Sequence, residues 1–280
     1  MKLFSLTLLA MIAFAANSVL NRIALAGGLI DPASFAIIRL FSGAAILCLI
    51  VLARSGSRPG LLTPARGISV GALLAYMLGF SFAYVSLDTG VGALILFGGV
   101  QITMFAGAVI MREAVSILKW VGALVAAAGL AWFLWPTPDA EINLIGAGLM
   151  AIAALGWGVY SLMGRGAKNA TAETAANFAL AAPLSLLALV SLLPNITFGG
   201  VVLACVSGVV TSGLGYALWY AVLPRLASST AAVAQLSVPI FAALGGVAFM
   251  SEDLTLRFVI AALVVLGGIG LSVVKPRTAR

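Results

Sequence analysis

The sequence predicts an all-α integral membrane protein with ten transmembrane helices, arranged as two inverted repeats of five helices each. Three observations support this fold class. Hydrophobic residues make up 63% of the chain and charged residues only 8%, against about 25% charged residues in soluble domains. Ten apolar runs are each long enough, or nearly so, to cross a bilayer. Segments of the two halves also resemble one another at separations of 139 and 143 residues.

A transmembrane helix needs about 20 residues, because each residue adds about 1.5 Å along the axis and the hydrocarbon layer is roughly 30 Å thick. Residues 1–26 also resemble a secretory signal peptide, but their counterpart in the second half favours a first transmembrane helix. Marking the apolar runs between charges, prolines and glycine clusters predicts spans at residues 3–25, 33–53, 68–87, 91–111, 115–135, 143–163, 174–193, 199–219, 228–250 and 256–274.

Lysine and arginine residues gather at alternate ends of these spans. Twelve of the 15 lie on the side that includes both chain ends, whereas Arg22 and Arg257 lie on the opposite side and Arg39 lies within the second span. Basic residues concentrate in cytoplasmic loops, so we expect both the N- and C-termini to be cytoplasmic. The same rule accounts for the net charge of +7, and no nucleic-acid partner is expected.

Two pairs of segments indicate an internal duplication. When residues 106–116 are aligned with 245–255, Glu113 matches Glu252. When residues 14–22 are aligned with 157–165, Arg22 matches Arg165. Each unit then has five spans, and because five is odd the second unit enters the membrane in the opposite orientation. Inverted repeats around a central site are typical of secondary transporters that work by alternating access. We place the repeats at residues 1–137 and 138–280; the aligned pairs are AGAVIMREAVS (106–116) with GGVAFMSEDLT (245–255), and FAANSVLNR (14–22) with WGVYSLMGR (157–165).

The second half resembles the repeat of the EamA family in the drug/metabolite transporter superfamily. Residues 217–271 contain a small-residue helix, Pro239, a Gly/Ala-rich run, an acidic residue and a glycine-rich last helix. The first half matches less closely, with Val100 where Pro239 stands in the second. The resemblance implies ten helices in a basket-like bundle in the bacterial cytoplasmic (inner) membrane, and export of small metabolites. Among the members, the chain is most similar to the YddG-type amino acid exporters.

The candidate substrate-binding residues are polar or aromatic side chains inside the spans. The aromatic residues of the third span, for example, recur every four positions on one helix face. An amide in lipid lacks partners, so an asparagine or glutamine there either faces a wet cavity or bonds another helix. The aromatic side chains either line a cavity or pack against other helices. The predicted set is Asn17, Ser18, Tyr76, Phe80, Tyr84, Phe97, Gln101, Trp157, Tyr160, Tyr216 and Gln235.

Two further residues have two interpretations each. Pro239 has no amide hydrogen to donate to the carbonyl of Gln235, so the sequence predicts a kink that is either a gate or a static bend. Arg39 is the charged residue that lies well inside a span. It either attracts a substrate carboxylate or extends to the outer interface.

The missing residue types bear on the mechanism. No Asp or Glu lies in the middle of a predicted span, and the chain has no His. Proton-coupled pumps commonly rely on such groups, so we predict a facilitator or exchanger without a carboxylate relay. A cavity of aromatic and amide side chains suits amphipathic zwitterions such as aromatic or other neutral amino acids.

Other function classes fit less well. Within transport, a multidrug exporter, a nucleotide-sugar or phosphate-ester carrier and a lipid flippase remain alternatives. A channel is disfavoured because no charged ring or carbonyl-filter motif is visible. An intramembrane enzyme would need a base or an acid pair that the spans lack, so we expect no catalytic residues. Cys48 and Cys205 lie inside apolar runs, and no metal or cofactor is expected. The sequence leaves the oligomeric state open, with a monomer as one option.

Overall fold

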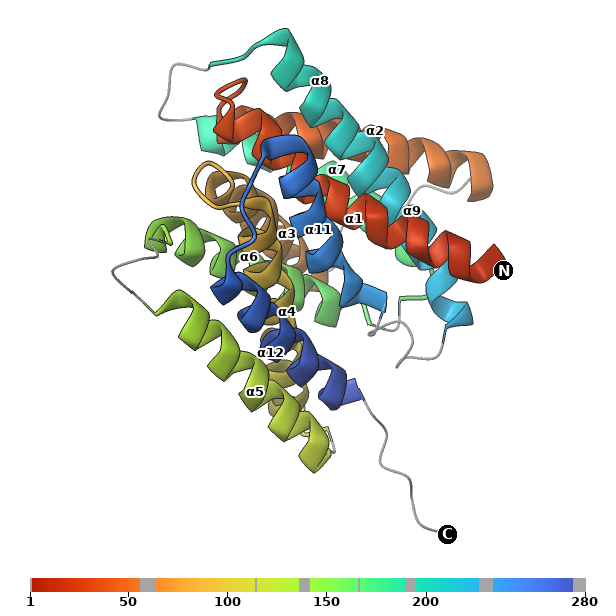
Figure 1. Cartoon of the computed structure of the whole chain (residues 1–280). Helices are drawn as coiled ribbons and strands as arrows, with labels where there is room; N and C mark the ends of the chain where they lie inside the picture. The colour runs from red at the N-terminus through yellow and green to blue at the C-terminus, as the bar shows by residue number, and fades with distance from the viewer. Residues whose placement is uncertain are drawn as a thin grey trace.

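A computed structural model describes residues 2–55, 64–113, 115–135, 142–165, 167–189, 195–226 and 234–273. These residues are almost entirely helical (Figure 1). The first half consists of α1 (Lys2–Ala26), α2 (Pro32–Ser55), α3 (Pro64–Ala83), α4 (Thr89–Ile110) and α5 (Ile117–Leu134). The second half consists of α6 (Leu144–Met163), α7 (Ala170–Ser185), η1 (Leu186–Leu189), α8 (Phe198–Val206), η2 (Ser207–Leu214), α9 (Gly215–Val222), η3 (Leu223–Arg225), α11 (Ser237–Met250) and α12 (Leu256–Val273).

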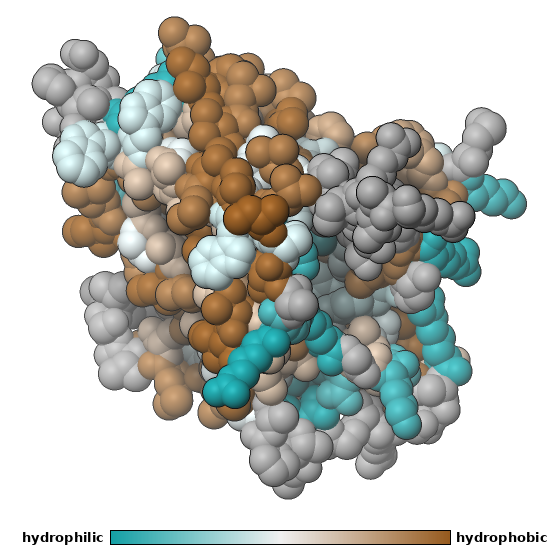
Figure 2. Space-filling model, turned by 90° about the horizontal axis from the view of Figure 1, so that it is seen from below, coloured by the Kyte–Doolittle hydropathy of each residue, from teal (hydrophilic) through white to brown (hydrophobic). Residues whose placement is uncertain are grey.

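The helices confirm the predicted fold class. Within the described ranges, eight helical segments are long and apolar enough to cross a membrane, and α11 and α12 are two further apolar helices of shorter length. Large hydrophobic side chains remain exposed along most of them. Figure 2 shows hydrophobic side chains over much of one face and hydrophilic side chains gathered towards one edge. A surface of this kind is suited to lipid rather than to water.

The packing of α5 against α12 is antiparallel, as an inverted duplication requires. Gly122 of α5 lies against Gly268 of α12, and Phe133 at the other end of α5 contacts Phe258 at the start of α12. The two helices lie side by side at one edge of the bundle in Figure 1. Glycine removes the side chain that would separate two backbones, so the two repeats approach closely at this contact.

Two further contacts between the repeats mirror each other. Gly107 of α4 lies against Leu162 of α6, and Gly245 of α11 lies against Val19 of α1. Leu162 is 143 positions after Val19, the separation found between their parent segments. The fourth transmembrane helix of each repeat therefore packs on the first helix of the other repeat: α4 on α6, and α11 on α1.

The turns that follow α4 and α11 share an unusual backbone conformation. Arg112 has φ 56° and Ser251 has φ 53°, and within the described residues these are the two non-glycine positions with positive φ. Left-handed backbone is uncommon outside glycine. The two residues are 139 positions apart, so the aligned segments 106–116 and 245–255 end their helices with the same turn.

The helical segment from Phe198 to Val222 contains a feature that the apolar pattern did not predict. Its middle part, η2, is a π-helix of eight residues. Gly208 in η2 lies so close to α2 that a Cβ atom there would meet the side chain of Ser42 and the backbone carbonyl of Arg39. π-helical turns are rare and are frequently found at functional sites.

The structure describes an interruption of the helix just before Pro239. Ala234 and Gln235 are helical, Leu236 forms a turn, and α11 begins at Ser237. Pro239 therefore lies in the first turn of α11 and has no amide hydrogen to donate to the carbonyl of Gln235. The role of Pro239 as a gate stays a prediction. Residues 228–233 of the predicted span lie outside the described residues.

Candidate substrate cavity

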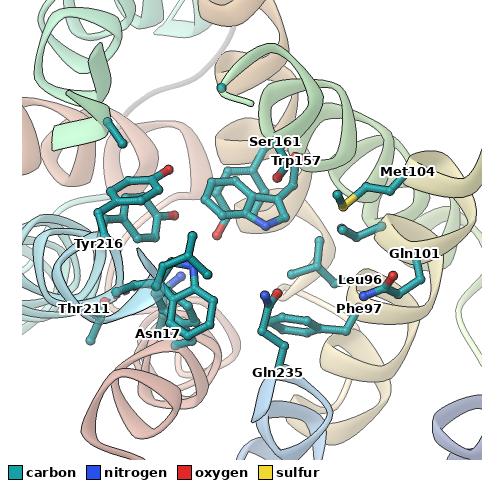
Figure 3. Close-up of a pocket in the computed structure, with 18 of the residues that line it drawn as sticks. Asn17, Leu96, Phe97, Gln101, Met104, Trp157, Ser161, Thr211, Tyr216 and Gln235 are labelled. Atoms are coloured by element: carbon teal, nitrogen blue, oxygen red, sulfur yellow. Dashed lines mark hydrogen bonds between the residues drawn. The ribbon is translucent and has the colours of Figure 1, made fainter. Parts of the chain in front are cut away.

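A cavity of about 790 Å³ lies in the middle of the bundle, between the two repeats. Side chains from α1, α3 and α4 of the first repeat line it together with side chains from α6, η2 and α9 of the second. Figure 3 shows these side chains converging from several directions. Of the predicted binding residues, the structure places Asn17, Ser18, Tyr76, Phe80, Phe97, Gln101, Trp157, Tyr216 and Gln235 around this cavity.

Two of the predicted residues lie elsewhere. Tyr84 is fully buried and its hydroxyl group donates to the backbone carbonyl of Thr89 at 3.2 Å. Tyr160 lies behind Trp157, on which its ring stacks at 5.5 Å between centroids. The Tyr160 hydroxyl donates to Thr174 and borders a second, smaller pocket. Helical spacing placed Tyr84 on the same face as Tyr76, and its ring does pack on Phe80 at 4.8 Å between centroids. Tyr84 lies one turn beyond Phe80, outside the cavity lining.

A connected set of aromatic rings forms one wall of the cavity. The ring centroid of Trp157 is 4.9 Å from that of Tyr76 and 5.2 Å from that of Tyr216. Phe14 of α1 adds a further edge contact to Tyr216 at 5.7 Å. Tyr76 and Trp157 are able to meet because Gly156 of α6 lies directly against the backbone of Tyr76. Such a wall offers a large apolar contact area together with polar hydroxyl groups at its edges.

A hydrogen-bonded group next to this wall joins α1 to the π-helix. The side-chain oxygen of Asn17 accepts from Ser207 at 2.6 Å and from Thr211 at 3.0 Å. Asn21 lies one turn further along α1 and donates to Asn17. Asn17 therefore fulfils both predicted options, since it lines the cavity and also bonds another helix.

Two glutamine amides point into the cavity from different elements. Figure 3 shows Gln101 reaching in from α4, and Gln235 reaching in from the residues that precede α11. Within the described part of the chain, no hydrogen bond joins the amide of Gln101 or Gln235 to another residue. These amides are therefore available to a polar ligand.

The two ends of the cavity differ. At one end, here called the Arg22 end, Arg22 pairs with Glu252 at 3.1 Å and with Asp88 at 3.0 Å. Glu252 also accepts from the backbone amide of Thr89 at 2.8 Å. None of these residues lines the cavity, so this polar network closes it off.

At the other end, here called the Arg165 end, the cavity reaches exposed residues of the turn after α6, including Gly164 and Arg165. Arg165 pairs with Glu113 at 2.9 Å, and both side chains are 43% exposed. The structure thus has a cavity that is open at the Arg165 end and closed at the Arg22 end. The two pairs, Arg22 with Glu252 and Arg165 with Glu113, involve the residues that the sequence alignment matched between the two repeats, although the sequence did not predict the ion pairs.

Arg39 does not extend to the outer interface, which corrects one of its two interpretations. Its side chain is fully buried. The guanidinium group donates to Ser212 at 3.0 Å and to the hydroxyl of Tyr76 at 3.1 Å. The helix packing of α2 against η2 and α3 turns the side chain towards the interior, where it finds these partners.

Sequence reasoning missed several residues of the site. Thr211 joins the cavity wall through the π-helix, whose register an α-helical pattern cannot give, and Ser207 donates to the cavity-lining Asn17. Three serine and threonine residues within the run 199–219 were the available signal. Met104 and Leu96 also line the cavity, but apolar residues in a membrane helix carry no signal that separates a cavity from lipid.

Comparisons with known proteins agree with this architecture. Residues 144–274 match the model of the EamA-like transporter family. A protein of Pseudomonas aeruginosa, described as "Uncharacterized protein PA1977", is 44% identical over 279 residues, which cover 98% of this chain and 95% of that protein. A solved structure titled "Crystal structure of protein" superposes with a TM-score of 0.66 at 22% identity, over 94% of this chain and 95% of the other. The last likeness concerns the fold alone.

Members of this family are multi-pass membrane proteins that transport small molecules and are not enzymes. The open cavity between two inverted repeats is the arrangement that such transport requires. The chain therefore belongs to the EamA-like transporter family of the drug/metabolite transporter superfamily.

Proposed function

We propose that the protein is a secondary transporter of the bacterial inner membrane that exports aromatic or other neutral amino acids. The observation that carries the proposal is the cavity itself, with its aromatic wall, free glutamine amides and opening at one end. Its volume of about 790 Å³ leaves room for an aromatic amino acid and some water. The apolar part of such a ligand packs on the rings, and its polar groups meet amides and hydroxyl groups.

Transport then proceeds by alternating access. The cavity loads at the Arg165 end, which the distribution of basic residues assigns to the cytoplasm. Opening the other end requires the network of Arg22, Asp88 and Glu252 to separate. Both chain termini would lie on the cytoplasmic side, and reporter tags at the two ends provide the check. Tags on opposite faces would contradict the inverted arrangement.

The proposed cycle uses no carboxylate relay. Glu252 and Glu113 lie at opposite ends of the bundle, each in an ion pair, and neither lines the cavity. Export would follow the substrate gradient or be driven by exchange. In vesicles with substrate equilibrated across the membrane, an imposed proton gradient should cause no accumulation. Concentrative uptake driven by that gradient would show the opposite.

A substrate panel in reconstituted vesicles tests the proposal most directly. We expect exchange of radiolabelled phenylalanine to be inhibited by aromatic and neutral amino acids, and not by nucleotide sugars or sugar phosphates. Several cationic side chains would be needed for the phosphate esters. Among the described residues that line the cavity, Arg165 alone is cationic, and it lies at the rim. Inhibition by phosphate esters or by varied hydrophobic cations would instead favour the carrier or multidrug alternatives.

Two substitutions tie the activity to this cavity. Gln101→Ala and Trp157→Ala should each reduce transport without reducing the amount of protein in the membrane. Leu124→Ala is a suitable control, because Leu124 is 64% exposed on α5 and does not line the cavity. Unchanged transport in both cavity variants would remove these residues from the site.

A further inference from the structure

Arg39 is a cation held inside the membrane-spanning bundle. Its side chain has no exposed surface, and a guanidinium group stays protonated in proteins. The Cζ atom of Arg39 lies 5.4 Å from the ring centroid of Tyr76 and 5.1 Å from that of Phe80. Both of these rings line the cavity. Arg39 therefore lies one side chain behind the cavity wall.

The charge of Arg39 is only partly compensated. Among the described residues, no aspartate or glutamate forms an ion pair with it, and its buried Nη1 atom has no hydrogen-bond partner. The other buried arginine, Arg66, pairs with Glu173 at 2.9 Å. Burying an unpaired charge away from water is expensive, so a nearby negative charge would be strongly favoured.

The hydroxyl group of Tyr76 connects Arg39 to the cavity. Because its oxygen accepts a hydrogen bond from Arg39 Nη2 at 3.1 Å, its own hydrogen points away from the arginine. Tyr76 lines the cavity beside Tyr216, whose hydroxyl group interacts with that of Tyr76, and an acceptor on a ligand in the cavity would compete for this hydrogen. A hydroxyl that accepts from a cation becomes a better donor, since hydrogen bonds in a chain polarise one another.

The second partner of Arg39 lies next to a cavity-lining residue in the chain. Ser212 accepts from Arg39 Nε at 3.0 Å and follows Thr211, which lines the cavity and bonds Asn17. Both residues lie in the π-helix η2. The guanidinium group is thus held from α3 and from η2, and its orientation relative to the cavity is fixed.

We propose that Arg39 is the residue that makes the cavity selective for ligands with a carboxylate. The carboxylate accepts a hydrogen bond from Tyr76 and supplies the negative charge that Arg39 lacks. Arg39 acts through its hydrogen bond to Tyr76 and through the electrostatic attraction of its positive charge for the carboxylate. It is a specificity-determining residue that need not touch the ligand. The amino acid identity of the ligand rests on the proposed function, whereas the requirement for a carboxylate does not.

Binding of matched acids and amides to the full-length protein in lipid nanodiscs tests this role. The probes are phenylalanine with phenylalaninamide, and 3-phenylpropionate with 3-phenylpropionamide. We expect the wild type to bind each acid roughly tenfold more tightly than its amide, which corresponds to about 1.4 kcal/mol. Arg39→Gln should weaken acid binding until the two affinities are similar, and leave amide binding unchanged. Arg39→Lys should retain part of the preference.

The control is Arg257→Gln, which removes one positive charge far from the cavity and should keep the wild-type ratio of acid to amide affinity. Tyr76→Phe removes only the hydroxyl group and should lower the ratio in a protein that keeps its ring packing. If Arg39→Gln fails to fold, Tyr76→Phe decides the question. A wild-type ratio in folded Arg39→Gln, or in Tyr76→Phe when the former does not fold, would overturn the proposal.

The two proposals can fail separately. Binding of 3-phenylpropionate but not of phenylalanine would reject amino acids as substrates and keep the role of Arg39. Equal binding of acids and amides by the wild type, or no binding of any acid, would reject the role of Arg39. Transport of phenylalanine alongside equal acid and amide affinities would leave only the proposed function standing.

Discussion

Asn17 shows how single residues combine packing with recognition in this cavity. Its one side-chain oxygen accepts from two hydroxyl groups, those of Ser207 and Thr211, and its side chain also lines the cavity. These bonds cross between the two repeats, since α1 belongs to the first and η2 to the second. A buried hydroxyl that loses its acceptor incurs the full cost of desolvation.

We therefore expect Asn17→Ala to lower the free energy of unfolding by about 1–3 kcal/mol, because the buried hydroxyl group of Ser207 loses its acceptor. The hydroxyl group of Thr211 keeps the backbone carbonyl of Ser207 as an acceptor, at 2.8 Å. Thermal unfolding of the purified protein provides the measurement. The double variant Asn17→Ala/Ser207→Ala should be less destabilised than the sum of the single variants, since both partners are then apolar. Strict additivity would show that the hydrogen bond contributes nothing to stability.

At the scale of elements, small residues decide which helices can touch. Gly208 allows the π-helix to contact the backbone of α2, next to Arg39. Gly156 in the same way allows α6 to contact the backbone of α3 beside Tyr76. Other glycines have open space around them, as Gly148 does on α6. Glycine content alone therefore does not identify the close contacts.

Gly208→Ala should destabilise the protein strongly, because the added Cβ atom would meet the side chain of Ser42 and the carbonyl of Arg39. Forcing an extra carbon into a packed contact typically costs about 1–3 kcal/mol. The matched control, Gly148→Ala, should be neutral or slightly stabilising because alanine favours a helix by roughly 0.5–1 kcal/mol. Membrane yield and thermal unfolding of both variants are the measurements. Equal behaviour of the two would contradict the packing argument.

The sequence predicted helices better than it predicted contacts between them. Apolar runs locate a membrane helix to within a few residues, and α1 at Lys2–Ala26 lies close to the predicted span at 3–25. The π-helix could not be predicted, because it changes which side of the helix carries Thr211 without changing the amino-acid composition of the apolar run 199–219. The partners of Arg39 depend on α3 and η2, which lie far from it in the sequence.

At the scale of the whole molecule, the duplication places one arginine–glutamate pair at each end of the bundle. The pair of Arg22 and Glu252 is largely buried, at 14% and 10% exposure, and is joined to Asp88. The pair of Arg165 and Glu113 is 43% exposed on both sides. Exposed ion pairs contribute little free energy because water and ions screen them. The network at the Arg22 end therefore stabilises closure of that end more than the pair of Arg165 and Glu113 could at the other end.

Glu252→Gln should favour opening of the Arg22 end, because it removes the charge that holds Arg22 between the two repeats. A cysteine placed at Ser18, in a protein with Cys48 and Cys205 replaced, should then react faster with an impermeant maleimide added from that side. The control Glu113→Gln should leave this rate unchanged, since its pair is exposed and lies at the open end. An unchanged rate in Glu252→Gln would contradict a closing role for the network.

The seam between α5 and α12 has a mechanical consequence. It joins the two halves through glycine backbones, yet neither helix contributes a side chain to the cavity. Alternating access requires the two halves to move relative to one another, so substitutions at this contact should affect that movement and leave the ligand's surroundings intact. Bulkier residues along this seam, as in Gly129→Ala, should slow turnover while the half-saturating substrate concentration and the order of preferred substrates stay as they were.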